Sequence, residues 1–247
     1  MSWYGGYGYG SYYRQPTVSE LQSKAKASMR KLEKQGRTLN PIAIEGRTIA
    51  RSWWGIAWID NLDRYADFSN RIGRGKKYVR AGCVIDLQVS RGKISAVVQG
   101  SRAAPYEVTI DIDPLPTDAL DTMLTGTSVR AESLDALLDG NFPDELKDSL
   151  TARQGGIFPA PSEIHFKCSC PDSARICKHV AAAIMAVAPG LDRDPMLLFE
   201  LRGVETEGLI ARTVEQKLNL MLENADVETD RILDVDDDQL TALFGVL

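Results

Sequence analysis

The sequence predicts an α+β protein in which helices cover an antiparallel β-meander and a small cysteine-rich finger follows the meander. Three observations lead to this fold class: residues 79–112 contain three segments of alternating apolar residues, residues 17–70 contain two segments with helical apolar spacing, and residues 164–187 gather three of the four cysteines. A meander with one apolar face needs a cover, which helices can supply. A length of 247 residues with 44% hydrophobic residues suffices for one large domain or two small ones.

The chain begins with a tail rich in glycine and tyrosine, residues 1–16, whose composition predicts disorder. From Thr17 or Ser19 to Gln35, the spacing of Leu21, Ala25 and later apolar residues predicts an amphipathic helix with a basic surface. This helix either docks one apolar stripe on the protein or places its lysines and arginines on phosphates.

An aromatic-rich segment, residues 47–70, forms the centre of the first half. Trp54, Trp58, Leu62 and Tyr65 follow one another at intervals of four, four and three, so that one helix face can bury them together. We expect this Trp-rich helix to cover the sheet.

A basic segment rich in glycine comes next and is expected to precede a strand at residues 79–89. A permissive glycine backbone flanked by arginine and lysine can wrap a phosphate, and a tyrosine can stack on a base. The segment lacks the Gly-Lys-Ser/Thr sequence of a P-loop. Its candidate nucleic-acid contacts are Arg71, Arg74, Lys76, Lys77, Tyr78 and Arg80.

The predicted meander consists of residues 79–89, 94–98 and 106–112. In the first strand Ile85, Leu87 and Val89 are expected on one face, and Cys83 is expected to be a core thiol. Short helices are predicted after the meander, at residues 118–124, 133–138 and 143–150.

The finger places four metal-ligand residues within twelve positions. Cys168 and Cys170 project to the same side of an extended strand, about 6.5 Å apart. Turn-forming residues after them can bring Cys177 and His179 back from the other side, at the start of a helix from Val180 to Val187. Three thiolates and one imidazole form a closed tetrahedral set, which predicts structural Zn²⁺.

Two other interpretations of the cysteines are burial as small hydrophobic residues and redox pairing of Cys168 with Cys170. His165 falls on the opposite strand face from these two cysteines, which favours a solvent-facing side chain or one that supports the ligands.

The pattern Cys-x-Cys, six residues, Cys-x-His running into a helix is similar to the SWIM zinc finger. The resemblance extends over roughly residues 37 to 210 and is to the bacterial single-finger SWIM proteins. It implies a zinc-binding module that accompanies a SWI/SNF-type helicase or binds DNA or protein. The segments that carry it are Ser52–Trp58, Tyr78–Gly82, Gln99–Ser101, Glu163–Phe166 and Leu201–Gly203.

The predicted domain division follows these segments: a tail at 1–16, an α+β region at 17–155, the SWIM finger at 156–190 and a helical C-terminal region at 191–247. Within the last region, residues 195–201 and 209–222 are expected to be helical. Residues 223–238 are rich in aspartate and glutamate, which predicts an acidic linker. Residues 240–247 are either a last helix or a docking peptide for a partner.

Charge is divided unevenly along the chain. Residues 1–102 hold 18 basic and 7 acidic residues, whereas residues 103–247 hold 11 basic and 27 acidic residues, which together give the net charge of −5. The basic half either binds phosphates or pairs with the acidic half. Beside the finger, three more residues are candidate nucleic-acid contacts: Lys167, Arg175 and Lys178.

The sequence therefore favours a non-catalytic zinc module that contacts nucleic acid, such as DNA, or a protein. A closed zinc shell activates no water, and neither a catalytic triad nor a nucleotide fingerprint is present. An adaptor that contacts only protein is the alternative, and an enzyme with a site in the first half is a third hypothesis. Clustered cysteines, no apolar run of about 20 residues and no signal peptide predict a cytoplasmic protein without a membrane span.

Overall fold

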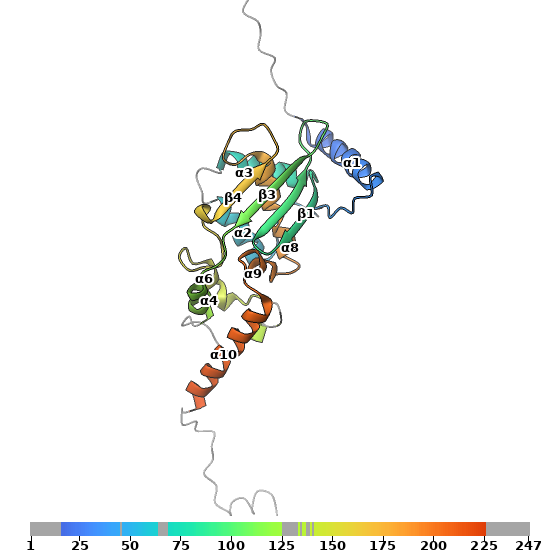
Figure 1. Cartoon of the computed structure of the whole chain (residues 1–247). Coiled ribbons are helices and arrows are strands. Elements are labelled where there is room, and N and C mark those ends of the chain that lie inside the picture. Colours follow the sequence, from blue (N-terminus) through green and yellow to red (C-terminus); the bar gives the residue numbers. More distant parts are fainter. Residues whose placement is uncertain are drawn as a thin grey trace, which may run out of the picture.

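A computed structural model describes residues 16–44, 46–63, 69–124, 133, 135, 136, 139 and 141–225 of the chain. It confirms the α+β class, with helices around one antiparallel sheet (Figure 1). In chain order the elements are α1 (Val18–Lys34), α2 (Trp53–Asp63), α3 (Ser69–Arg80), β1 (Val84–Ser90), β2 (Lys93–Val98), β3 (Tyr106–Ile112), α4 (Thr117–Leu124), the 3-10 turn η2 (Asp144–Leu146), α6 (Lys147–Thr151), the 3-10 turn η3 (Pro161–Glu163), β4 (Ile164–Cys168), α7 (Lys178–Met185), α8 (Ala188–Leu191), α9 (Leu197–Leu201) and α10 (Thr206–Ala225).

The sheet has the strand order β1-β2-β3-β4, and each neighbouring pair is antiparallel. The first three strands are the predicted meander. The fourth strand belongs to the finger: Cys168 lies opposite Val108 of β3, and Ile164 lies opposite Ile112. The finger is thus built into the sheet, although the sequence suggested a small unit docked beside it.

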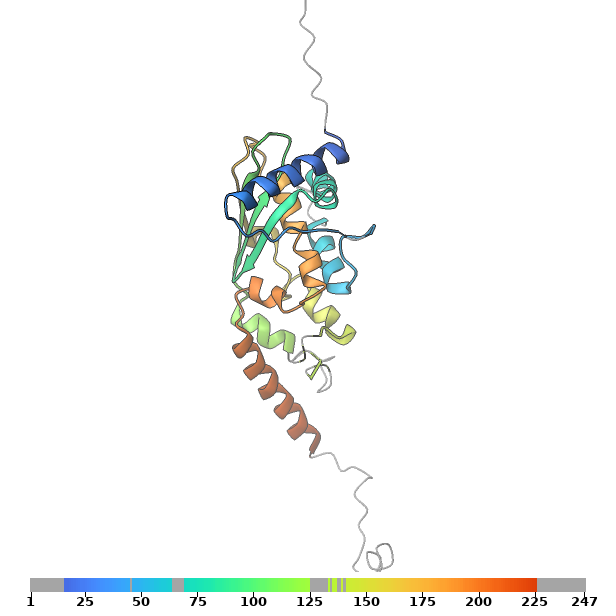
Figure 2. The same ribbon diagram turned by 90° about the vertical axis from the view of Figure 1, so that its right-hand side faces the viewer.

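Helix α1 begins at a capping box. The backbone N–H of Glu20 donates to Thr17 Oγ1 at 3.2 Å, and the backbone N–H of Thr17 donates to Glu20 Oε2 at 2.7 Å. Ala25 packs with Ile85 and Val97 in a small cluster on the outer face of the sheet. Figure 2 shows α1 lying across this face.

The expected alternation in the first strand is wrong at Ile85. Val84 lies opposite Val98 and Asp86 opposite Val97, so Ile85 is the extra residue of a β-bulge. The bulge turns Ile85 toward α1, whereas Val84 and Leu87 face the main core. The strand also begins five residues later than predicted, because residues up to Arg80 complete α3.

The cover of the inner sheet face is α7, the helix of the finger, and the prediction that α2 covers the sheet is wrong. Helix α7 contacts all four strands, and α2 contacts α8 and α3 instead. Every residue of α7 after Lys178 is buried. The fully buried Trp58 of α2 donates its indole N–H to the carbonyl oxygen of Ile184 at 2.8 Å, which ties α2 to α7.

The basic segment at residues 70–80 is a helix, α3, and the prediction of an extended phosphate-wrapping loop is wrong. A Cβ atom placed on Gly75 would lie 2.7 Å from the backbone carbon and the Cβ of Ala181. The glycine therefore permits close packing of α3 on α7, which outweighs its low helix propensity.

The predicted helices after the meander and in the C-terminal region appear as α4, η2 with α6, α9 and α10. Several sequence predictions lie outside the described residues: the tail at 1–15, Tyr65, residues 134, 137 and 138 of the predicted helix at 133–138, and the segments 226–238 and 240–247. Among the helices that are described, none is both long enough and apolar enough to cross a membrane.

Candidate metal centre

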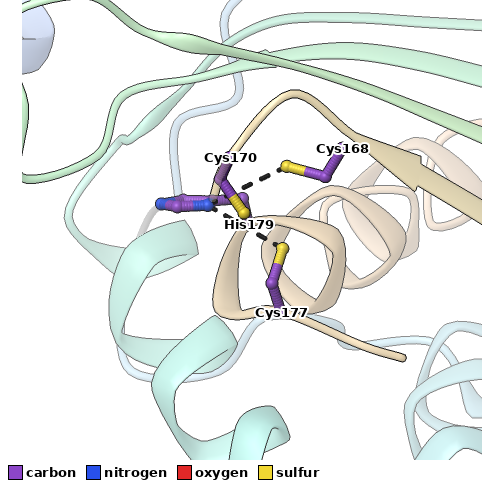
Figure 3. Close-up of side chains that lie close together, drawn as sticks. All are labelled: Cys168, Cys170, Cys177 and His179. Atoms are coloured by element: carbon purple, nitrogen blue, oxygen red, sulfur yellow. Dashed lines mark hydrogen bonds between the residues drawn. The ribbon is translucent and has the colours of Figure 1, made fainter. Parts of the chain in front are cut away.

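Four side chains converge where β4 ends and α7 begins (Figure 3). Cys168 is the last residue of β4, and Cys170 follows two residues later. Cys177 precedes α7, and His179 is the second residue of that helix. One ligand atom from each of the four residues lies within 4.8 Å of each of the others, so this cluster could bind a metal ion.

Local hydrogen bonds fix the positions of the sulfur atoms. Between the first two cysteines, the Ser169 backbone N–H donates to the Glu107 carbonyl oxygen at 3.0 Å, and Ser169 Oγ accepts from the Glu107 N–H at 3.0 Å. These bonds fasten the turn to β3. Cys177 Sγ accepts from the Val180 N–H at 3.4 Å, so the sulfur caps the helix that carries His179.

The donor set fits a tetrahedral ion. Cys168 Sγ and Cys177 Sγ lie 4.0 and 3.8 Å from His179 Nδ1. Zinc bonds of about 2.0 to 2.3 Å in tetrahedral geometry separate two ligand atoms by about 3.5 to 3.8 Å. Three sulfur atoms and one imidazole nitrogen are therefore arranged close to the spacing that one structural zinc ion requires.

The cysteines differ in their ionisation. Hydrogen bonds from the Cys168 thiol, from His179 and from the Val180 N–H lower the pKa of Cys177 to about 3. The hydrogen bond to Cys177 and burial raise the pKa of Cys168, and burial raises the pKa of Cys170. These shifts favour the thiolate at Cys177, and the positive charge of a bound ion would favour the thiolate at the other two cysteines as well.

His179 is held by packing. Its ring lies between Tyr106 and Tyr78, with ring centroids 4.4 and 5.6 Å away. Its Nε2 atom is buried and has no hydrogen-bond partner among the described residues. A Cβ atom on Gly100 would lie 2.8 Å from this nitrogen, so a side chain at that position would displace the imidazole. The sequence analysis did not identify Tyr106 and Gly100 as residues that position His179. The run Gln99–Ser101, which is part of the resemblance to the SWIM proteins, is the sequence feature that could have pointed to Gly100.

The candidate nucleic-acid residues of α3 do not form one surface. Tyr78 is only 4% exposed and packs on His179, so the prediction that it stacks on a base is wrong. Lys76 Nζ pairs with Asp63 at 2.6 Å, and Lys77 Nζ donates to the Pro16 carbonyl oxygen at 3.1 Å.

Arg71 pairs with Asp172 of the finger at 3.2 Å, which links α3 to the loop between the two ligand pairs. Arg74 and Arg80 are exposed and form no ion pair with a described carboxylate.

The three candidates beside the finger lie close to the cluster. Lys167 and Arg175 line a surface groove together with Cys168, and Arg175 Nη2 donates to the Pro161 carbonyl oxygen at 3.4 Å. Lys178 Nζ lies 5.3 Å from the centre of the Tyr78 ring. His165 is exposed and its Nε2 lies 3.0 Å from Asp113 Oδ1, so it takes no part in the cluster. Cys83 is fully buried, as expected of a core thiol.

Comparison with known proteins gives one informative similarity. Over 164 residues the chain is 37% identical to a protein of Mycobacterium tuberculosis named "Uncharacterized protein Rv2102". The match includes 66% of this chain and 59% of the relative, so the chain spans about three-fifths of the relative's length. No family model matches the chain, and no solved structure matches it. About two thirds of the chain therefore align with Rv2102, and the name of that protein states no activity.

Proposed function

We propose that the protein is a non-catalytic, zinc-stabilised module of the SWIM type that contacts nucleic acid in the cytoplasm. The observation that carries the proposal is the convergence of Cys168, Cys170, Cys177 and His179 at the junction of β4 and α7. The same four residues form the Cys-x-Cys and Cys-x-His pairs that resemble the SWIM finger. All four cysteines of the chain are free thiols, which agrees with a reducing compartment.

Zinc is the ion that this donor set favours. Soft thiolate ligands with one imidazole select zinc over magnesium or calcium, which prefer oxygen. Four protein ligands leave no position for a substrate, so the ion would stabilise structure without catalysis.

The nucleic-acid part of the proposal is supported by charge. Residues 17–37, which include α1, contain six basic and two acidic residues, and residues 69–80 contain five basic residues and no acidic ones. Arg74 and Arg80 on α3 are exposed, as are Lys26 and Arg30 on α1. Helices α1 and α3 pack against each other, so these charges belong to neighbouring elements. Exposed lysine and arginine side chains on neighbouring helices suit the phosphates of a nucleic acid.

Elemental analysis of the purified protein tests the metal. About one zinc ion per chain is expected in the wild type, and Cys177→Ser should lose it because one of four ligands is removed. Cys83→Ser is the matched control, since Cys83 is buried away from the cluster and its loss should leave the zinc content unchanged. Absence of zinc from the wild type would refute this part of the proposal.

Binding to single- and double-stranded DNA at low and moderate salt tests the partner. Replacing Arg74, Arg80 and Lys167 with alanine should weaken binding and reduce its salt dependence. Each phosphate contact releases condensed counterions from the nucleic acid, so a variant with fewer contacts releases fewer of them. A control variant, Arg153→Ala with Arg193→Ala, removes exposed charges from a different part of the molecule. Equal losses in both variants would point to net charge alone.

The accessory role beside a SWI/SNF-type helicase is part of the same proposal and is supported by the resemblance of the finger. Zinc without DNA binding would favour the alternative of a pure protein adaptor. Catalytic activity that survives Cys177→Ser would favour an enzyme instead.

A further inference from the structure

Helix α10 leaves an apolar face without a partner among the described residues. Seven large hydrophobic side chains are exposed in the described part of the chain, and five of them lie on this helix, with exposures between 41% and 67%. We call these five residues the α10 stripe. They are Ile210, Val214, Leu218, Met221 and Leu222.

The opposite side of α10 is anchored to the body of the protein. Leu209 and Thr213 are buried, Arg212 pairs with Asp121 of α4, and Lys217 pairs with Asp135. These contacts fix how α10 is rotated about its own axis, so that the α10 stripe faces away from the body of the protein. Figure 1 shows α10 running away from the sheet, past α4.

An acidic cavity lies at the first turn of the same helix. It is lined by Glu207 of α10, by Asp194, Glu200 and Glu205, and by the apolar side chains of Met196 and Val204. Its one basic lining residue, Arg91, pairs with Glu205. Three carboxylates therefore remain without a basic partner in the cavity.

The cavity and the stripe form one continuous surface. Residues spaced by three, four, seven and eleven positions share a helix face, so Glu207 lies on the same face as Ile210, Val214 and Leu218. The stripe spans 12 residue steps, or about 18 Å of helix. Its length and spacing match the groove contacts that an amphipathic helix makes through anchors at i, i+3 or i+4, and i+7.

We propose that this surface binds a cationic amphipathic helix of another protein. The apolar face of the partner would cover the α10 stripe, and lysine or arginine side chains at one end would pair with the carboxylates of the cavity. This inference does not depend on the proposed nucleic-acid contacts, which lie on α1, α3 and β4.

Charge argues against three other occupants: a second copy of the chain, nucleic acid and anionic lipid. On the outward face of α10 the charges without a described partner are Glu207 and Glu215, because Arg212 and Lys217 are paired with carboxylates of the body. A second copy of α10 would therefore bring carboxylates toward carboxylates. Nucleic acid and anionic lipid would meet the same repulsion.

The test measures binding of fluorescent synthetic helices to the full chain. Three peptides of about 18 residues, long enough for the stripe, are compared. The first is an amphipathic helix of leucine, alanine and lysine, the second is a scrambled peptide of the same composition, and the third is the amphipathic helix with glutamate in place of lysine. We expect the first peptide alone to bind, with an affinity that falls as salt rises.

Two variants locate the site. Replacing Val214, Leu218 and Met221 with serine should weaken binding at least about tenfold, because the anchors lose their apolar contacts. Glu200→Gln with Glu207→Gln should reduce the salt dependence. Ile56→Ser and Glu33→Gln are matched controls, an exposed apolar residue and an exposed carboxylate on α2 and α1 that should change neither property.

Several results would overturn the inference. Equal binding of the scrambled peptide would show attraction by charge alone, and equal binding of the glutamate peptide would show a surface that selects only apolar groups. A dimer in sedimentation experiments that dissociates in the serine variant would identify a second copy as the occupant. DNA binding measured on the same serine variant should be unchanged, which separates this surface from the proposed function.

Discussion

Residues from three elements position His179 at the candidate metal centre: it lies in α7, and its ring packs against Tyr78 of α3 and Tyr106 of β3. The spacing of Cys168 with Cys170 and of Cys177 with His179 predicts the two ligand pairs, because a strand and a helix start place such pairs on one side. The aromatic rings around His179 could not be found in this way. Tyr106 and Tyr78 come from β3 and α3, which are far apart in the chain and meet only in the folded core.

Burial of Cys83 predicts low reactivity of its thiol. Burial raises the pKa of this thiol from 9.0 to about 12, and the side chain is fully enclosed. In the folded protein a thiol reagent at neutral pH should leave Cys83 unmodified, and it should modify Cys83 only in denaturant. Rapid modification of all four in the folded protein would contradict the buried position.

The same thiol predicts a stability change in alkali. The unfolded chain ionises this thiol near pH 9.0, and the folded protein ionises it near pH 12, so the folded state favours the protonated form. Its contribution is complete below about pH 9 and is lost as the pH rises toward 12. The free energy of unfolding of Cys83→Ala should therefore fall less steeply over this range than that of the wild type.

Arg202 is a buried charge that holds the end of α9 to the sheet. It is 2% exposed, and its guanidinium donates to Glu163 Oε1 at 2.8 Å and to the Asp113 carbonyl oxygen at 2.9 Å. Arg202→Ala should lower the free energy of unfolding by about 3 kcal/mol, because the Glu163 carboxylate and the Asp113 carbonyl oxygen would lose the buried donor that pairs with them. The exposed Arg193→Ala should change it by less than about 0.5 kcal/mol. Denaturant titration measures both.

At the scale of the element, α3 shows why the sequence was misleading. Two glycines among five basic residues suggested a loop, since glycine lowers helix propensity. Packing on α7 decides the conformation instead, and no local pattern reveals a partner about 100 residues away. Helix α1 was predicted correctly because its capping box and its apolar spacing are both local.

The two glycines of α3 predict opposite stability changes. Gly75→Ala should destabilise the protein by about 1 to 3 kcal/mol, because the new methyl group would lie 2.7 Å from Ala181. Gly73→Ala should stabilise it by up to about 1 kcal/mol, because no atom lies within 4 Å of the new methyl group and alanine favours the helix. Changes of the same sign in urea unfolding would contradict the close packing of α3 on α7.

For the whole molecule, the candidate metal ligands are part of the main core. Cys168 ends a strand of the central sheet, and Cys177 and His179 begin the helix that covers it. The sequence could predict the fold class and three strands, because these depend on local alternation. It could not predict that the fourth strand pairs with β3, since this pairing joins residues more than 50 positions apart.

This arrangement predicts a cooperative response to a chelator. Removal of the metal should lower the melting temperature of the whole described core in one transition, because α7 packs on all four strands. Amide exchange in β1 and β2 should accelerate together with exchange in α7. Acceleration confined to residues 164–185 would instead show that the finger unfolds independently.

The position of α7 in the chain has a consequence for synthesis on the ribosome. Strands β1 to β3 are complete by Ile112, but the helix that covers their inner face begins at Lys178. During the intervening translation the apolar inner face lacks its cover, and exposed strands of this kind tend to aggregate. A nascent chain arrested before residue 164 should therefore bind chaperones, and release from them should coincide with the emergence of α7.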